Sequence, residues 1–163
     1  MDLKENSLKE GGYIMITGIG HTGLVVKDMN RMIKFYQDTF GFEIVLDTQV
    51  EGKEADDIVD FHVDSERIVI LKLGEVEIEM LEYKPVGREY PDDYRSNDLF
   101  GVHLALTSDN MDADYAMLKE KGVNIISKGP QTIPDSHPIL GGTKVLYLRD
   151  PEGHPLELIQ MPE

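Results

Sequence analysis

Apolar residues in the segment 28–41, DMNRMIKFYQDTFG, recur with the period of an amphipathic helix. The residues that set this period are Met32, Phe35, Tyr36 and Phe40. Steps of three and four residues place such side chains on one face of a helix. Asp28 has the chemistry of an N-cap, and Gly41 has that of a C-terminal stop. The pattern therefore predicts one helix across this segment.

Strand-like stretches surround this helix. Apolar and β-branched residues dominate four of them: 14–26, 42–50, 66–73 and 75–83. Apolar runs of this length, alternating or continuous, predict β-strands. The stretch EGKEADDIVDFHVDS, residues 51–65, is mostly polar, and we interpret it as a loop or an irregular sheet edge.

The segment 84–98, KPVGREYPDDYRSND, contains two prolines and a glycine and is predicted to link two halves of the chain. After it the order of elements restarts with a strand at 100–107 and a helix at 109–122. Three further strands are predicted: 123–127, 143–150 and 155–161. The Pro/Gly-rich loop 129–142 is long enough to act as a lid.

The two halves also match at individual positions. His21 and His103 lie in the first strand of their halves, and Glu79 and Glu157 lie in the last strand, at similar separations. An internal repeat of this kind indicates a duplicated structural unit. We therefore predict an α+β fold made of two tandem βαβββ modules. The predicted segments are a flexible N-terminal leader (1–13), the first module (14–83), a linker (84–99) and the second module (100–163).

Charge and composition exclude several classes of partner. The chain has 163 residues, 31 of them acidic and 16 basic, for a net charge of −15. Such a charge repels phosphate backbones, so we expect no nucleic-acid partner. No segment approaches the roughly 18 apolar residues of a membrane span, and the N-terminus lacks the apolar core of a secretory signal. These features predict a cytoplasmic protein that does not bind membranes.

Strand periodicity gives the glutamates an unusual position. In PLELIQM, Leu156 and Leu158 face one way and Glu157 faces the other, and Glu79 has the same relation to its apolar neighbours. A carboxylate in a partly buried strand is costly unless it is paired, hydrogen-bonded or bound to a metal. His21 and His103, which also have apolar neighbours, present the same problem.

Two imidazoles and two carboxylates at equivalent places in a duplicated module are a candidate four-ligand metal site. The predicted ligands are His21, Glu79, His103 and Glu157. Two nitrogen and two oxygen donors suit one divalent ion of Ni, Co, Zn, Mn or Fe. The chain contains no cysteine, so thiolate ligands are excluded.

These residues carry a family resemblance. The sequence resembles the vicinal oxygen chelate superfamily, which includes glyoxalase I, methylmalonyl-CoA epimerase, extradiol dioxygenases and bleomycin or fosfomycin resistance proteins. The likeness lies in GHTGLVV, FYQDTFGFEI, IEMLEY, GVHLAL and DPEGHPLELIQ. It implies paired βαβββ modules that curl round a metal, with the four ligand positions falling on the four residues named above.

The resemblance also implies a type of chemistry. Four ligands are typical of the members that move a proton next to a carbonyl through an enediolate, so we expect a metal-dependent lyase or isomerase similar to glyoxalase I. Its substrate would be a small α-oxygenated carbonyl compound or thioester. Glu157 and Glu79 are the candidate catalytic bases. The resemblance to bacterial glyoxalase I implies an Arg and an Asn that contact glutathione. This chain has Val25 and Tyr83 at those positions, which argues against lactoylglutathione as the substrate.

Three alternatives stay open. The first is an enzyme similar to methylmalonyl-CoA epimerase. That resemblance implies Gln at the position of Glu79 and a separate base on the third strand, but here Val69 and Ile70 offer no carboxylate. A metal-free ligand-binding or resistance protein would lack the ligand set. A three-ligand dioxygenase or thiol transferase would depend on Fe(II) and O2, or on a thiol and fosfomycin.

Other polar residues are weaker candidates. We interpret His62, His137 and His154 as structural or surface groups, and Glu77 as a solvated strand residue. Anionic substrates could contact residues of the linker: Arg88, Tyr90, Tyr94 and Arg95. An exposed sheet edge in each module favours pairing between chains, so we expect a homodimer.

Overall fold

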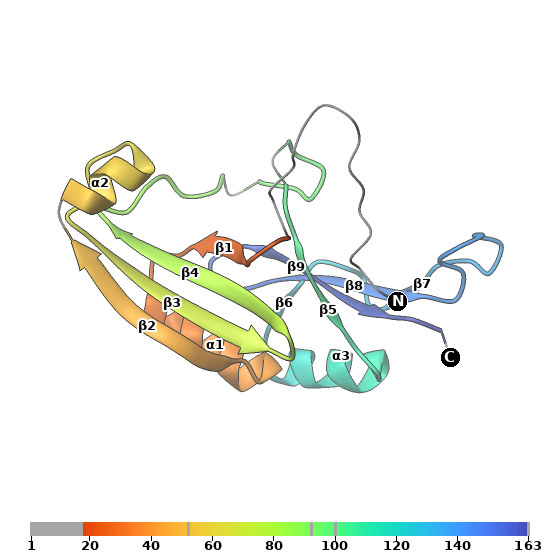
Figure 1. Cartoon of the computed structure of the whole chain (residues 1–163). Helices are drawn as coiled ribbons and strands as arrows, with labels where there is room; N and C mark the ends of the chain where they lie inside the picture. Colours follow the sequence, from red (N-terminus) through yellow and green to blue (C-terminus); the bar gives the residue numbers. More distant parts are fainter. Residues whose placement is uncertain (1–17, 52, 92, 100, 163) are drawn as a thin grey trace, which may run out of the picture.

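The computed structural model describes residues 18–51, 53–91, 93–99 and 101–162. The predicted leader and the first residues of the predicted strand 14–26 lie outside this part of the chain. Within it, the protein has the predicted α+β fold with two β-sheets (Figure 1). None of its helices is long and apolar enough to cross a membrane.

The first sheet has four strands in the order β1-β4-β3-β2. Its elements are β1 (Thr22–Val25), α1 (Met29–Phe40), β2 (Glu43–Glu51), α2 (Lys53–Val59), β3 (Ser65–Leu73) and β4 (Val76–Lys84). Strand β1 is parallel to β4, whereas the other neighbours are antiparallel. Strands β1 and β2 are therefore the two edges of this sheet.

The second sheet repeats this order as β5-β9-β8-β6, with the short β7 also paired to β8. Its elements are β5 (Leu104–Thr107), α3 (Met111–Glu120), β6 (Asn124–Ile125), β7 (Gln131–Thr132), β8 (Lys144–Arg149) and β9 (Pro155–Gln160). Strand β5 is parallel to β9, as β1 is to β4. The edge strand that begins each half thus lies beside the strand that carries the candidate glutamate.

Both predicted helices are present. The Asp28 side chain accepts a hydrogen bond from the backbone N–H of Arg31 at the start of α1, and Gly41 ends the helix with φ of 77°. Helix α3 begins after Asn110, whose side chain accepts from the N–H of Ala113. Side-chain capping and a left-handed C-terminal residue act within a few residues of chain, so the sequence alone identified both ends of α1.

The predicted loop at 51–65 was wrong in one respect, because residues 53–59 form helix α2. Ala55 of this helix is buried, at 2% exposure, whereas Ile58 is 82% exposed. The Asp56 carboxylate accepts the backbone N–H of Val63 at 2.7 Å and so closes the chain behind the helix. A polar helix held by one tertiary contact of this kind has little apolar periodicity to reveal it.

One hydrophobic core joins the two halves. Helices α1 and α3 lie next to each other on the same side of the molecule, below the strands in Figure 1. Lys121, just after α3, donates its ammonium to the carbonyl of Asp38 at 2.9 Å. The largest fully buried side chains come from both halves: Tyr36, Met29, Met32, Leu71, Ile78, Met80, Met111, Leu118, Leu146, Leu148, Leu156 and Val26.

The turn before β9 fastens the second half to the first. Asp150 is buried, and its carboxylate accepts the N–H groups of Glu152 and His154, both at 2.9 Å. The same carboxylate lies 2.7 Å from Nδ1 of His154 and accepts the hydroxyl of Tyr36 at 3.2 Å. Nε2 of His154 lies 3.0 Å from the carbonyl of Val25. The DPEGH turn, residues 150–154, therefore connects the two halves of the chain. His154 has a structural role there, in agreement with its interpretation from sequence.

Stability is expected to fall as pH rises because of His154. Burial alone would lower the pKa of this imidazole, but the hydrogen bond and charge of Asp150 outweigh burial and raise the pKa above 6.5. The cation can donate from both ring nitrogens, to Asp150 and to Val25. A raised pKa in the folded state gives stability that is complete below the unfolded pKa and is lost as pH rises through the folded pKa.

Thermal unfolding between pH 6 and pH 9 checks this expectation. The melting temperature should decrease above about pH 6.5, and His154→Gln should show a flatter profile. The His62→Gln background is used for both proteins, because contact with Asp56 also raises the pKa of His62. If the melting temperature decreases equally with pH in the proteins with and without His154, this histidine is not the source of the pH dependence.

Candidate metal and active site

Burial confirms which face of each sheet carries the glutamates. Ile78 and Met80 in β4 are fully buried, while Glu79 between them is partly exposed. In β9, Leu156 and Leu158 are buried and Glu157 is partly exposed. The apolar residues pack toward the helices, so both carboxylates project from the opposite, open face.

Two of the four predicted ligands, His21 and Glu79, lie together. Nε2 of His21, just before β1, lies 3.1 Å from Oε2 of Glu79, whose side chain is 21% exposed. Gly23 of β1 is in register with Glu79, and a Cβ at this glycine would lie 4.0 Å from Oε2. The small residue at this position leaves the carboxylate room to extend over the edge strand toward the histidine.

The other two predicted ligands, His103 and Glu157, have the same geometry. Nε2 of His103, just before β5, lies 3.0 Å from Oε2 of Glu157, whose side chain is 13% exposed. Ala105 occupies the register position beside Glu157 that Gly23 occupies beside the other glutamate. Both histidines precede their strands instead of lying within them. The duplicated pattern has thus produced two equivalent His–Glu pairs.

Tyr147 of β8 is a site residue that sequence reasoning missed. It lies directly across from Glu157 in the antiparallel register, and its ring packs edge-on against His103 with centroids 5.4 Å apart. Burial, then the adjacent Glu157 carboxylate, raises the pKa of the Tyr147 phenol. Its place between buried Leu146 and Leu148 was the available signal, since that alternation puts it on the open face.

The structure does not bring the two pairs together within one chain. Among the described residues, no three histidine or acidic side chains lie close enough to hold a metal ion. Each pair alone fits a metal in geometry: cis ligands at bond lengths of about 2.1 Å in an octahedron are about 3.0 Å apart. Imidazole nitrogen and carboxylate oxygen are also ordinary ligands of divalent transition metals.

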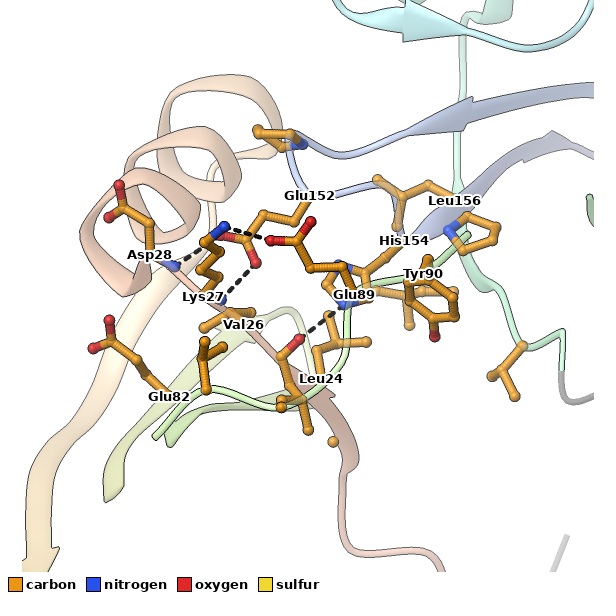
Figure 2. Close-up of a pocket in the computed structure, with 18 of the residues that line it drawn as sticks. Leu24, Val26, Lys27, Asp28, Glu82, Glu89, Tyr90, Glu152, His154 and Leu156 are labelled. Carbon is orange, nitrogen blue, oxygen red and sulfur yellow. Dashed lines mark hydrogen bonds and ion pairs between the residues drawn. The ribbon is translucent and has the colours of Figure 1, made fainter. Parts of the chain in front are cut away.

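A groove of 1050 Å³ is lined by β1, residues 86–90 of the linker, residues 102–104 and the turn before β9, and Figure 2 shows part of this lining. Of the four predicted ligands, His103 alone is among its lining residues. Two of its carboxylates have partners within the groove: Glu89 pairs with the Lys27 ammonium, and Glu152 accepts the backbone N–H groups of Lys27 and Asp28 at 2.7 and 2.8 Å. The Glu152 contacts connect the turn before β9 to the start of α1.

The weaker histidine candidates have structural contacts. Nδ1 of His137 accepts the N–H of Leu140 at 3.0 Å within the loop 129–142. His62 is exposed and lies 3.1 Å from both Asp56 and Asp64. These contacts agree with the structural or surface role that the sequence suggested.

Two linker tyrosines pack against the second half. The rings of Tyr90 and Tyr94 are 4.8 Å apart, and Arg149 lies over Tyr94 while donating to its carbonyl at 2.7 Å. The N–H of Arg95 is bonded to Asp98. Arg88 lines the groove. These contacts bind the linker to the protein, and the predicted role in binding an anionic substrate stays a prediction.

Comparison with known proteins decides the family. The model of the Glyoxalase/Bleomycin resistance protein/Dioxygenase superfamily matches residues 18–158. The chain belongs to this superfamily. The predicted resemblance is therefore confirmed, and the matched region contains both His–Glu pairs.

Individual members of the superfamily have different activities. The chain is 32% identical to a 2-epi-5-epi-valiolone epimerase of an Actinomyces species, over 88% of this chain and 79% of that protein. It is 31% identical to the metallothiol transferase FosB of Staphylococcus haemolyticus, over 88% and 84%. A glyoxalase family protein from Bacillus cereus has the same fold, with a TM-score of 0.77, 17% identity and coverage of 96% and 100%.

Proposed function

We propose that the protein is a divalent-metal-dependent lyase or isomerase that moves a proton next to a carbonyl, through an enediolate, on a small α-oxygenated substrate. The observation that carries this proposal is the pair of equivalent His–Glu contacts, at 3.1 and 3.0 Å, on the open faces of two matching sheets. The relative named as an epimerase supports an isomerase over other members of the superfamily.

Each group of the chain has a proposed role. His21, Glu79, His103 and Glu157 would hold the ion. A bound divalent ion supplies Lewis-acid stabilisation to negative charge that develops on substrate oxygens. Glu157 is the proposed base that takes the proton from carbon, and Glu79 is its counterpart on the other side of the substrate. Partial burial of both carboxylates keeps bulk water from competing for that proton.

Incorporation of solvent deuterium tests this reaction directly. The protein is supplied separately with Ni, Co, Zn, Mn and Fe(II) and incubated in D2O with hydroxyacetone. Proton NMR should show loss of the signal of the hydrogen next to the carbonyl with at least one ion, and no loss with the chelated protein. No exchange with any ion on this and related hydroxyketones would reject proton transfer.

A site shared by two chains would complete the ligand set. Strands β1 and β5 are both free edges, and each lies beside a His–Glu pair. Pairing of β1 from one copy with β5 from a second copy would place His21 and Glu79 against the second copy's His103 and Glu157. A two-fold symmetric dimer forms two such sites. We therefore propose a homodimer whose sites combine both chains.

Mixed variants are expected to recover part of the metal binding. Glu79→Gln and Glu157→Gln each damage both sites of their own dimers. A mixed dimer has one doubly altered site and one intact site, so an equal mixture after co-refolding should regain about a quarter of the wild-type sites. High-affinity metal content measures this recovery. No recovery despite proven mixed dimers would place all four ligands within one chain.

Tyr147→Phe is expected to impair the reaction more than metal binding. The phenol lies across from Glu157 and would orient that carboxylate or donate to substrate oxygen. Loss of such a partner should lower kcat about 10-fold to 100-fold, while metal affinity changes much less. Calorimetric metal titration and the deuterium assay separate the two effects. Equal losses in both would make Tyr147 a support for the metal ligands only.

A thiol transferase is the second candidate, favoured by the likeness to metallothiol transferase FosB. The complete set of four candidate ligands argues for proton transfer instead. Incubation with fosfomycin and a low-molecular-weight thiol distinguishes them, because a transferase would consume both compounds and an isomerase would consume neither.

A further inference from the structure

The open face of the first sheet is largely aliphatic around Glu79. The register places six aliphatic side chains on this face: Val25, Leu46, Val50, Ile68, Ile70 and Leu81. Three of them are well exposed, Val25 at 53%, Leu46 at 42% and Val50 at 37%. A contiguous exposed apolar surface is uncommon on a soluble protein and marks a binding surface.

This face has little positive charge to hold an anion. On its described strand residues, Lys72 is the single cationic side chain, and the register places it between Glu43 and Glu77. A carboxylate or phosphonate is usually recognised by arginine or lysine in a charge-assisted hydrogen bond. An anionic group at the far end of the face would instead meet the carboxylate of Glu66, which the register places across from Tyr83.

An aromatic contact closes one end of the aliphatic face. Tyr83 lies four residues after Glu79 on the same strand, about 13 Å away along it. Its ring packs against Phe61, which follows α2, with centroids 5.6 Å apart. Burial, then contact with Glu66, raises the pKa of Tyr83 to about 12, so its hydroxyl stays neutral. The face therefore runs from the Glu79 carboxylate to an aromatic end, where the one further carboxylate on β3, Glu66, is buried at 7% exposure.

We propose that the substrate is a neutral α-oxygenated carbonyl compound with a hydrocarbon chain, and that this chain lies on the aliphatic face between Glu79 and the Phe61–Tyr83 contact. The inference rests on the proposed function, because it places the carbonyl end of the substrate at His21 and Glu79. It adds that the site selects for apolar length and against a second anionic group.

Calorimetric binding to a series of hydroxyketones tests the proposal. The full chain, with excess Zn, is titrated with hydroxyacetone and its homologues that have n-propyl, n-pentyl and n-heptyl chains, and with the ω-carboxylates of the longer members. Affinity should increase about fourfold per added methylene until the chain reaches Phe61 and Tyr83. The carboxylates should bind more weakly than neutral compounds of equal length.

Substitutions locate the hydrocarbon chain on the protein. Leu46→Ser changes an exposed residue of β2 and leaves the buried core intact, whereas Ile70→Thr changes a half-buried residue across from Glu79. Both should reduce the gain in affinity per methylene. Val76→Thr is the matched control, because Val76 is 61% exposed on the same strand as Glu79 but has the parity of the opposite face.

The outcomes separate this inference from the proposed function. Affinity that does not depend on chain length, or that improves with a carboxylate, overturns the substrate class even if deuterium exchange is observed. A change of oligomeric state in Leu46→Ser, with no change in ligand binding, also overturns it and assigns the face to a second copy. Chain-length dependence without deuterium exchange supports the apolar site and rejects the proposed reaction alone.

Discussion

Replacing Glu79 and Glu157 together with glutamine is expected to lower the affinity for divalent metal by more than about 100-fold, beyond the usual effect of a group that only supports a ligand. Each carboxylate lies within 3.1 Å of a histidine nitrogen, so the change removes two anionic donors and keeps the shape of both side chains. A neutral amide oxygen is a weaker ligand for Ni, Co, Zn, Mn or Fe. Proton transfer should be lost together with the metal.

Glu77→Gln is the matched control for this experiment. Glu77 is on the same strand and the same open face as Glu79, and it lies across from Lys72 instead of beside a histidine. Elemental analysis of protein purified without tag or chelator, followed by calorimetric titration, measures both variants. Wild-type affinity in the double variant would remove these glutamates from the metal site. Equal losses in Glu77→Gln would show a general effect of the acidic face.

Asp150→Ala is expected to destabilise the fold by about 3–5 kcal/mol, the range for removing one partner from a buried charged network. Four groups lose their acceptor: the backbone N–H groups of Glu152 and His154, the imidazole of His154 and the hydroxyl of Tyr36. In a chain of this length, such a loss should lower the melting temperature by roughly 10 °C. Calorimetry near pH 6, where His154 is charged, gives the largest effect.

Glu152→Gln tests whether this effect belongs to the buried acceptor. Glu152 lies in the same turn, but it is less buried and accepts two backbone N–H groups, of which an amide oxygen can keep one. Its loss should be at most about 1 kcal/mol. Similar small losses in both variants would mean that the turn does not fasten the two halves.

Local sequence signals identified most of the elements. Helix α1 was readable from its apolar spacing and from Asp28 and Gly41, because these effects act over one or two turns of chain. Helix α2 was missed because it is polar and has little apolar periodicity, although the buried Ala55 and the contact between Asp56 and Val63 stabilise it. Tyr147 was missed because its importance depends on the strand beside it, and cross-strand neighbours have no fixed separation in sequence.

The sequence by itself determined the duplicated fold and singled out four candidate ligands, because strand parity and internal repetition are properties of residue order. Tertiary structure alone decided that these residues form two separate His–Glu pairs. Each histidine reaches the glutamate of its own half across an edge strand with glycine or alanine at the crossing, and the two pairs stay apart within one chain. Packing also decided two other features: the sheet face that lacks cations and the turn that connects the two halves. Both follow from contacts between residues distant in the chain.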